Sequence, residues 1–527
     1  MPDAETVEMR SSCSPGHVVL VLDLGGSGIR ALAVSLGGRV LVAHKEPFRL
    51  VYPASASPGA AEFSEDIWAT AVSVIRSTVA MLPEGVRVEA IACTSMREGF
   101  FLLDTEGRIV YGGPNVDRRA VEECREFAEH RGEELFSLTG QPVFPPVGSI
   151  HAPFRLMWLA RHEPERLRRA RLFLMIADWL AFRLTGVPAC ELALATSSAL
   201  VDVRRLDWCW DLLTDLGVSH IEFPRLVPAG SRIGSLGREV ARAAGLPEAI
   251  PVLAAGPDTQ CALLGCKGVR HGDTAIVAGT TAPIQRAVAS PLPPDMPDIW
   301  TSCHVVPGMW VYESNAGHAG FVYQWFVGVV TDMVNSLSIP ARVSMADVYT
   351  RADEWAREAP VGAGGLRSDM GPRTMRIRDG PLASRGALVG ICDAGPQATT
   401  KAHLVRALME NIAFSFAGNI EELDKEYGSR AERVWLSGGL ARSHTLCQIV
   451  ADVLELPVEV PEEVESAAVG AAISAMVGTG MFGGWEEAAD AVISSRETLY
   501  PDPQRSRLYS QVLAEWTRFR DARLRGS

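Results

Sequence analysis

Apolar runs interrupted by glycine open each half of the chain. Residues 17–24, 29–36 and 39–46 are mainly apolar, and the glycines at 25–28 and 37–38 separate them. Strands joined by short glycine turns form an antiparallel meander. A similar pattern returns at 274–288, where two apolar runs flank Gly279-Thr280-Thr281. The repetition predicts two related domains that face each other, each opening with a hairpin.

Strands and helices alternate through the rest of both halves. Apolar residues at helical spacing predict a helix over 65–82, and the run 88–93 predicts a buried strand. In the second half, the same reasoning predicts a strand, a helix, a strand and a helix at 434–436, about 443–454, 457–460 and about 466–479. This alternation favours the α/β class.

The chain has 527 residues, which is too long for one hydrophobic core, so we expect two domains with a boundary near 265–272. The remaining segments, 289–299 and 360–386, are expected to be surface insertions or lids. The expected division is a disordered tail, two domains and a C-terminal tail at 1–16, 17–268, 269–515 and 516–527.

Charge and cysteine content exclude several functions. The net charge is −13 without a basic run, which argues against nucleic acid or an anionic membrane as a partner. No apolar stretch is long enough to span a bilayer, and the first sixteen residues lack the apolar core of a secretion signal. Ten scattered cysteines without a CxxC motif indicate reduced thiols, and hence a cytoplasmic protein.

Two glycine loops and an aspartate are the candidate chemistry. One apolar run ends in Asp23-Leu24-Gly25-Gly26-Ser27-Gly28-Ile29-Arg30, and another ends at Asp258. The chain has four lysines, and none lies in a GxxxxGK[ST] loop, which excludes a P-loop. A phosphate site here therefore relies on backbone N–H groups, Mg²⁺ and arginine.

These motifs resemble the FGGY carbohydrate kinases over about residues 17–515. The motifs, in the family's order, are 23–30, Asn115-Val116-Asp117-Arg118-Arg119, Asp258, 279–281, 386–410, and Ser437-Gly438-Gly439 with 465–470. The resemblance implies the two-domain actin/hexokinase/Hsp70-like ATPase fold, with ribonuclease H-like domains around a cleft, and ATP and Mg²⁺ as cofactors. Within the family, Ser95-Met96-Arg97-Glu98-Gly99 and His304-Val305-Val306-Pro307 are most similar to the autoinducer-2 kinase branch.

The resemblance implies that Asp258 is the general base and that Asp23, with Asp258, holds Mg²⁺ through water. The structural alternatives are a helix N-cap at Asp258 and a turn aspartate at Asp23. Gly25, Gly26, Ser27 and Arg30 would contact phosphate; the structural alternative for Arg30 is a surface hairpin residue. Gly26 stands where the family usually has Thr, so Ser27 is the candidate hydroxyl.

The resemblance also implies a facing nucleotide site. Gly279, Thr280 and Thr281 would bind the β- and γ-phosphates, and Gly438, Gly439 and Ala467 would admit adenosine. A plain hairpin turn and an ordinary strand-to-helix turn are the structural alternatives.

Substrate contacts are expected from Arg97, Glu98, Asn115, Asp117 and Thr259. A carboxylate and a planar guanidinium can hold adjacent hydroxyls. The alternatives are a salt bridge that pins the strand end at 97–98 and a helix start at Thr259. No role is assigned to Arg155.

The sequence therefore predicts an ATP-dependent kinase for the terminal hydroxyl of a small open-chain ketose or polyol, with the autoinducer-2 precursor as the narrower candidate. A xylulose- or glycerol-type kinase and a non-catalytic sugar sensor remain the alternatives. The expected partners are a sugar or polyol and ATP, with a homodimer as a candidate assembly.

Overall fold

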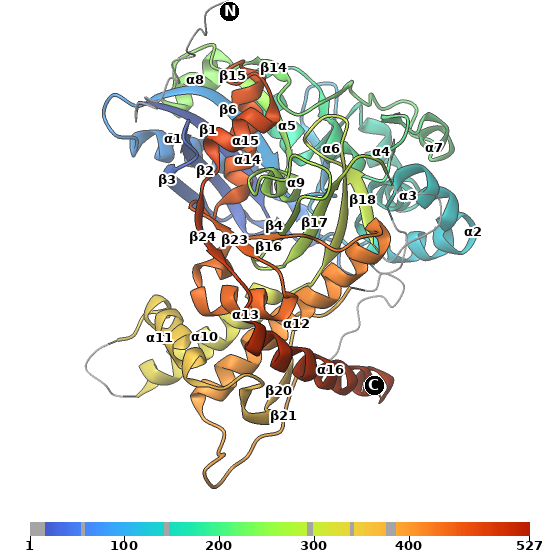
Figure 1. Cartoon of the computed structure of the whole chain (residues 1–527). Helices are drawn as coiled ribbons and strands as arrows, with labels where there is room; N and C mark the ends of the chain where they lie inside the picture. Colours follow the sequence, from blue (N-terminus) through green and yellow to red (C-terminus); the bar gives the residue numbers. More distant parts are fainter. Residues whose placement is uncertain are drawn as a thin grey trace, which may run out of the picture.

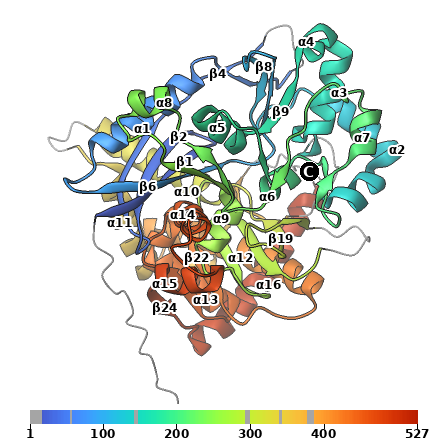
Figure 2. The ribbon, with the colours of Figure 1, turned by 90° about the horizontal axis from the view of Figure 1, so that it is seen from above.

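Two mixed β-sheets organise the chain into two lobes (Figure 1). The computed structural model describes residues 16–53, 58–141, 147–291, 299–337, 342–375 and 386–526. Figure 2, a view from above, shows the first lobe and the second lobe meeting around α9 and α14.

The first sheet has six strands. Their order is β14 (Arg232–Ser235), β15 (Pro251–Pro257), β6 (Arg87–Ser95), β1 (His17–Gly25), β2 (Gly28–Ser35) and β3 (Val40–Glu46). The β1–β2–β3 segment is the expected antiparallel meander, whereas β6 and β15 run parallel to β1. The carboxyl ends of β1, β6 and β15 therefore meet at one edge of the sheet.

The second sheet repeats this plan. Its order is β18 (Trp300–Cys303), β19 (Trp310–Asn315), β17 (Pro283–Val288), β16 (Thr274–Val277), β22 (Val434–Ser437), β23 (Val458–Pro461) and β24 (Ser495–Leu499). The hairpin β16–β17 is antiparallel, and β22 and β23 continue parallel to β16. The predicted repetition and the α/β class are confirmed.

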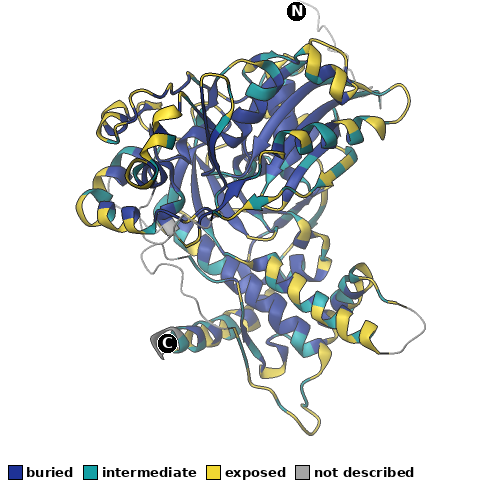
Figure 3. Cartoon of the chain, turned by 180° about the vertical axis from the view of Figure 1, so that it is seen from behind, coloured by how far each residue is buried: buried dark blue, intermediate teal, exposed yellow. Residues whose placement is uncertain are grey.

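Burial on both faces explains the continuous apolar run of β1. Leu20 and Leu22 belong to the core that includes α1 (Ile67–Ala80), and Val19 and Val21 belong to a second core that includes α14 (Ser466–Gly478). A strand that is covered on both faces needs apolar residues at every position. Figure 3 shows the result as buried strands between helices whose outer faces are exposed.

Helices surround the sheets. In the first half they are α2 (Val121–Thr139), α3 (Ala152–His162), α4 (Pro164–Arg169), α5 (Ile176–Thr185), α6 (Leu192–Thr196), α7 (Trp210–Asp215), α8 (Arg238–Ala244) and α9 (Asp258–Leu264). In the second half they are α10 (Ala319–Ser336), α11 (Met345–Glu358), α12 (Lys401–Tyr427), α13 (His444–Leu454), α15 (Trp485–Val492) and α16 (Pro503–Gly526). Within the described ranges, none of these helices is long and apolar enough to cross a membrane.

In the described part of the chain, smaller sheets of two or three strands lie outside the two main sheets, four in the first lobe and one in the second. They pair β8 (Ile109–Gly113), β7 (Phe100–Leu103) and β9 (Leu172–Met175); β4 (Leu50–Val51) and β5 (Glu62–Phe63); β10 (Cys190–Glu191) and β13 (Leu226–Val227); β11 (Val201–Asp202) and β12 (Asp207–Trp208); and β20 (Arg367–Asp369) and β21 (Ala387–Val389).

Helices α9 and α14 pack backbone to backbone where the two lobes meet. A Cβ atom on Gly470 would lie 1.8 Å from the carbonyl oxygen of Cys261, and one on Gly265 would lie 2.0 Å from that of Ser466. Only glycine permits so close an approach. The contact fixes the first residue of α9, Asp258, relative to both sheets.

Two segments that were expected to be irregular contain regular structure. Residues 516–527 were expected to be a tail, but α16 continues to Gly526, because the buried Trp516 donates from Nε1 to the Ser368 carbonyl at 2.7 Å. The region 360–386 contributes strand β20, which pairs with β21. Residues 1–15 of the expected disordered tail, 292–298 and 376–385 lie outside the described residues.

We expect Gly470→Ala to lower the thermal unfolding midpoint, because the new methyl group would overlap the Cys261 carbonyl and force α9 and α14 apart. Overpacking of this kind costs about 1–3 kcal/mol or more. Gly132→Ala in α2 is the matched control, since its Cβ would meet only the Ala128 side chain at 3.9 Å. The control should be neutral or stabilising by up to about 1 kcal/mol. An unchanged midpoint for Gly470→Ala would refute the packing argument.

Candidate active site

Asp23 lies at the carboxyl end of β1, beside its antiparallel neighbour Arg30. Arg30 donates from Nε and Nη2 to Oδ2 of Asp23 at 3.0 and 2.5 Å, and from Nη1 to Oε2 of Glu465 at 2.9 Å. Asp23 is 2% exposed, and its Oδ1 is buried without a hydrogen-bond partner. A buried carboxylate oxygen without a partner fits a cation or its water shell.

The turn between β1 and β2 forms the first glycine loop. Gly26 and Ser27 are exposed, and the Ser27 hydroxyl accepts from Nζ of Lys45 at 2.7 Å. Gly28 has a φ of +156°, and a Cβ atom there would lie 2.6 Å from the Glu46 carbonyl oxygen. Lys45, which carried no prediction from the sequence, therefore brings an ammonium group to this loop.

Asp258 begins α9 at the end of β15, beside the carboxyl ends of β1 and β6. Burial, followed by the negative charge of Asp23, raises the pKa of the Asp258 carboxyl to about 7, while the positive charge of Arg97 opposes this shift. A carboxyl group with a pKa near neutrality is suited to accept a proton. Thr259, the next residue, donates from its hydroxyl to Oε1 of Gln260 at 2.5 Å.

Arg97 and Glu98 follow β6 and approach the second lobe. Arg97 donates from Nη1 and Nη2 to the two carboxylate oxygens of Glu313, on β19, at 2.7 Å each. Its Nε lies 3.5 Å from Oε1 of Glu98, and its guanidinium carbon lies 5.8 Å from the centre of the Trp300 ring. Burial raises the pKa of Glu98 against the effect of Arg97. Glu98 has a φ of +62°, a left-handed conformation that is strained for this residue.

Arg155 holds the loops that carry the expected substrate residues. It is fully buried and donates to the carbonyl oxygens of Glu98, Gly113 and Pro114, the last two at 3.1 and 3.0 Å. Asn115 follows Pro114, is partly exposed, and bonds the Glu98 side chain. Arg155, to which the sequence assigned no role, thus positions both Glu98 and Asn115.

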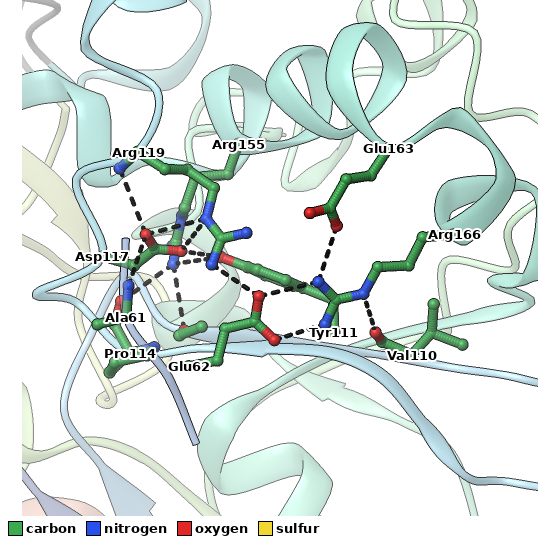
Figure 4. A network of polar contacts seen from close by, with 11 residues as sticks. Ala61, Glu62, Val110, Tyr111, Pro114, Asp117, Arg119, Arg155, Glu163 and Arg166 are labelled. Carbon is green, nitrogen blue, oxygen red and sulfur yellow. Dashed lines mark hydrogen bonds and ion pairs between the residues drawn. The ribbon is translucent and has the colours of Figure 1, made fainter. Parts of the chain in front are cut away.

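Asp117 lies beneath this loop in the polar network of Figure 4. Its carboxylate is 0% exposed and accepts from the Tyr111 hydroxyl at 2.5 Å, from Nε of Arg119 at 2.9 Å and from the Ala61 N–H at 3.2 Å. The side chain therefore stabilises the loop from inside the protein. Among the expected substrate residues, Asp117 is the one with an exposure of 0%.

A cavity of about 740 Å³ opens between the second glycine loop and α10–α11. Gly279, Thr280 and Gly439 line it. The other lining residues come largely from α10, α11 and the segment after β22, and include Tyr323, Gln324, Tyr349, Thr350, Asp353, Arg442 and Ser443. No sequence motif pointed to the residues on α10 and α11, whose helical spacing is that of ordinary amphipathic helices.

Three of the residues expected in the facing nucleotide site, Thr281, Gly438 and Ala467, do not line this cavity. Thr281 is exposed at the turn, and Ala467 lies in the first turn of α14. Gly438 has a φ of +87°, and a Cβ atom there would lie 2.7 Å from the Ala278 carbonyl oxygen. It therefore lets the ends of β16 and β22 approach closely, which shapes the cavity without lining it.

The described residues include no cluster of three or more His, Cys, Asp or Glu side chains arranged to hold a metal. The pair Asp23 and Asp258 fits Mg²⁺ better than it fits a metal that needs three or more protein ligands. Mg²⁺ keeps most of its water and takes one or two carboxylates together with substrate phosphates. Glu313, Gln285 and Glu465 are further groups at the site that the sequence did not single out.

Two sheets that repeat one strand order, each with a glycine turn after its first strand, and a buried carboxyl group at the end of β15 are the features of a phosphotransferase of the actin and hexokinase class. Family models for the N-terminal and C-terminal domains of the FGGY family of carbohydrate kinases match residues 18–265 and 274–479. The chain belongs to this family and is an ATP-dependent carbohydrate kinase, as the sequence predicts.

The relatives include the autoinducer-2 kinase of Klebsiella pneumoniae, which is 31% identical over 507 residues, 94% of this chain and 92% of that protein. The xylulose kinase of Rhodospirillum rubrum has a similar structure, with a TM-score of 0.79, 26% identity, and coverage of 96% of this chain and 98% of that one. The gluconate kinase of Lactobacillus acidophilus shares the fold, with a TM-score of 0.78, 18% identity, and coverage of 96% and 98%.

The raised pKa of Asp258 predicts a pH-dependent effect of Asp258→Asn on stability. The ordinary value is 3.8 and the folded value about 7, so the folded state holds its proton more tightly than the unfolded state. Wild-type stability from this group is therefore present at low pH and is lost as pH rises from about 4 to about 7. Asn does not titrate, so Asp258→Asn should gain stability relative to wild type between pH 5 and pH 8.

Urea unfolding at both pH values measures this difference, and the exposed Asp211→Asn on α7 serves as the control. A difference between Asp258→Asn and wild type that is the same at pH 5 and pH 8 would contradict the assigned pKa.

Proposed function

We propose that this kinase transfers the γ-phosphoryl group of ATP to the terminal hydroxyl of a small open-chain ketose or polyol, with the autoinducer-2 precursor as the narrower candidate. The observation that carries the proposal is the position of Asp258. Its carboxyl group, with a pKa of about 7, lies at the strand ends that also carry Asp23 and the Arg97–Glu98 pair.

In the proposed reaction, Arg97, Glu98 and Asn115 hold the substrate hydroxyls, and Thr259 adds a contact beside the base. Asp258 takes the proton of the terminal substrate hydroxyl as the hydroxyl oxygen forms a bond to the γ-phosphorus. The bond from that phosphorus to the β,γ-bridging oxygen breaks, and ADP leaves. Mg²⁺, held through water by Asp23 and Asp258, would neutralise charge on the β- and γ-phosphates.

The two glycine loops would bind the triphosphate. Backbone N–H groups at Gly25, Gly26, Gly279 and Thr280, with nearby hydroxyl groups, are suited to phosphate oxygens. Arg30, already tied to Asp23 and Glu465, would reach phosphate only by exchanging a partner. The cavity of about 740 Å³ has room for adenosine.

We further propose that residues 17–268 form the sugar-binding domain with the base, and that 269–515 form the nucleotide-binding domain. A homodimer and a cytoplasmic location stay predictions. A xylulose- or glycerol-type substrate is the second candidate, supported by the structural likeness to a xylulose kinase at 26% identity. A coupled ADP-release screen over small ketoses, polyols and the autoinducer-2 precursor distinguishes these substrates.

Asp258→Asn should lower kcat by roughly 10²–10⁴-fold, because a neutral hydroxyl loses its proton acceptor. ATP affinity, measured by calorimetry, should change little, since the proposed adenosine cavity lies on the second lobe. The control Asp211→Asn should keep wild-type turnover. Near-normal phosphorylation by Asp258→Asn would exclude Asp258 as the base.

Glu98→Gln and Arg97→Ala should raise the KM for the sugar or lower kcat, while the KM for ATP stays near the wild-type value. A buried polar site loses selectivity when its hydrogen-bonding groups are removed, often by large factors. Glu239→Gln, on the exposed first turn of α8, is the matched control. Unchanged sugar kinetics in both site variants would argue against substrate binding at this pair.

A further inference from the structure

The guanidinium of Arg97 is neutralised by a carboxylate from the other lobe. Both Nη atoms donate to Glu313, whose side chain is 1% exposed. Gln285 is fully buried on the neighbouring strand β17. It donates from Nε2 at 2.7 Å to Oε2 of Glu313, the oxygen that also accepts from Nη1 of Arg97. Glu313 is thus fixed in place, and a bidentate pair of this kind is among the strongest polar contacts in proteins.

The other charged groups around Arg97 are mainly negative. Glu98 contacts its Nε, and Asp258 lies within reach of its charge. Arg155 is fully buried and donates from its two Nη atoms to carbonyl oxygens and the Tyr111 hydroxyl. His151 stays neutral, because burial lowers its pKa to about 4. A substrate therefore meets one paired guanidinium and several carboxyl groups.

We propose that Glu313 is a specificity-determining residue, which occupies Arg97 so that the site accepts uncharged polyhydroxy substrates and rejects sugar acids. The inference rests on the proposed function of Arg97 and Glu98 as the hydroxyl-binding pair. The fold alone does not decide the charge of the substrate, because a structural neighbour is a gluconate kinase, and gluconate carries a carboxylate.

The physical reason is competition for one guanidinium. A sugar acid needs a cation for its carboxylate, and Arg97 presents its two Nη atoms, the edge suited to a bidentate pair, to Glu313. An acid would also have to lie near Glu98 and Asp258, where like charge is unfavourable. A hydroxyl group needs only single hydrogen bonds, which Nε of Arg97 and the oxygens of Glu98 can supply.

The test measures binding of acids and of neutral sugars to the full-length protein without ATP. Matched pairs are D-xylulose with D-xylonate, and glycerol with D-glycerate. Glu313→Gln keeps the size of the side chain and removes its charge, which releases Arg97 for a substrate carboxylate. We expect Glu313→Gln to bind the acids at least about tenfold more tightly than wild type, with weaker binding of the neutral sugars. Glu239→Gln should leave all affinities unchanged.

Turnover gives a second readout. Wild type should prefer the neutral member of each pair by about 10³-fold or more in kcat/KM, and Glu313→Gln should reduce that preference at least about tenfold. If Glu313→Gln does not fold, Gln285→Met loosens Glu313 without touching Arg97 and should shift acid binding in the same direction.

Equal use of acid and neutral sugar by wild type, or unchanged acid binding in these variants, would overturn the inference. Failure of the proposed function looks different, because wild type would then release no ADP with any neutral sugar, whatever the acids do.

Discussion

The contact between α9 and α14 is the constraint on which the rest of the site depends. Each helix follows a parallel strand of its own sheet, and glycine lets their backbones touch where a methyl group would lie within 2 Å of a carbonyl oxygen. Because Asp258 is the first residue of α9, this contact sets the distance of its carboxyl group from both sheets. The same contact joins the two sheets whose strands β1 and β16 end in the two glycine loops.

A second constraint is the concentration of carboxyl groups that this arrangement brings together. Asp23, Glu98, Asp258 and Glu313 come from three strand ends of one sheet and one strand of the other, and burial raises the pKa of Glu98 and Asp258. Buried charges of one sign persist only when they are paired or titrate. Arg97 forms ion pairs with Glu98 and Glu313, and Arg30 forms one with Asp23. The carboxyl group of Asp258 instead has a pKa near neutrality. The raised pKa of Asp258 therefore follows first from burial and second from the charge of Asp23, and Arg97 only partly opposes it.

The sequence predicted the elements that have local signals. The glycine hairpins at 25–28 and 279–281 and the strands around them follow from apolar runs and turn residues, and the family resemblance pointed to Asp258 and the 97–98 pair. Contacts between distant residues have no such signal. Arg97 and Glu313 are 216 positions apart, and Glu313 sits in an ordinary strand. The burial of Asp117 had no signal either, because charge in a motif does not reveal that Tyr111 and Arg119 enclose it.

The ion pairs Arg97–Glu313 and Arg30–Glu465, which both join the lobes, differ in the free energy needed to break them. Arg97 and Glu313 are 12% and 1% exposed, so separating them would leave a buried charge, which typically costs about 3–5 kcal/mol. Arg30 and Glu465 are 32% and 35% exposed, and a pair so open to water contributes about 0–1 kcal/mol. The lobes are therefore held firmly at Arg97 and Glu313 and weakly at Arg30 and Glu465. A movement that admits a nucleotide therefore costs less free energy if it breaks the Arg30–Glu465 pair than if it breaks the Arg97–Glu313 pair. The Arg30–Glu465 pair lies beside the loop where the phosphates are expected to bind, and its weakness favours opening on that side.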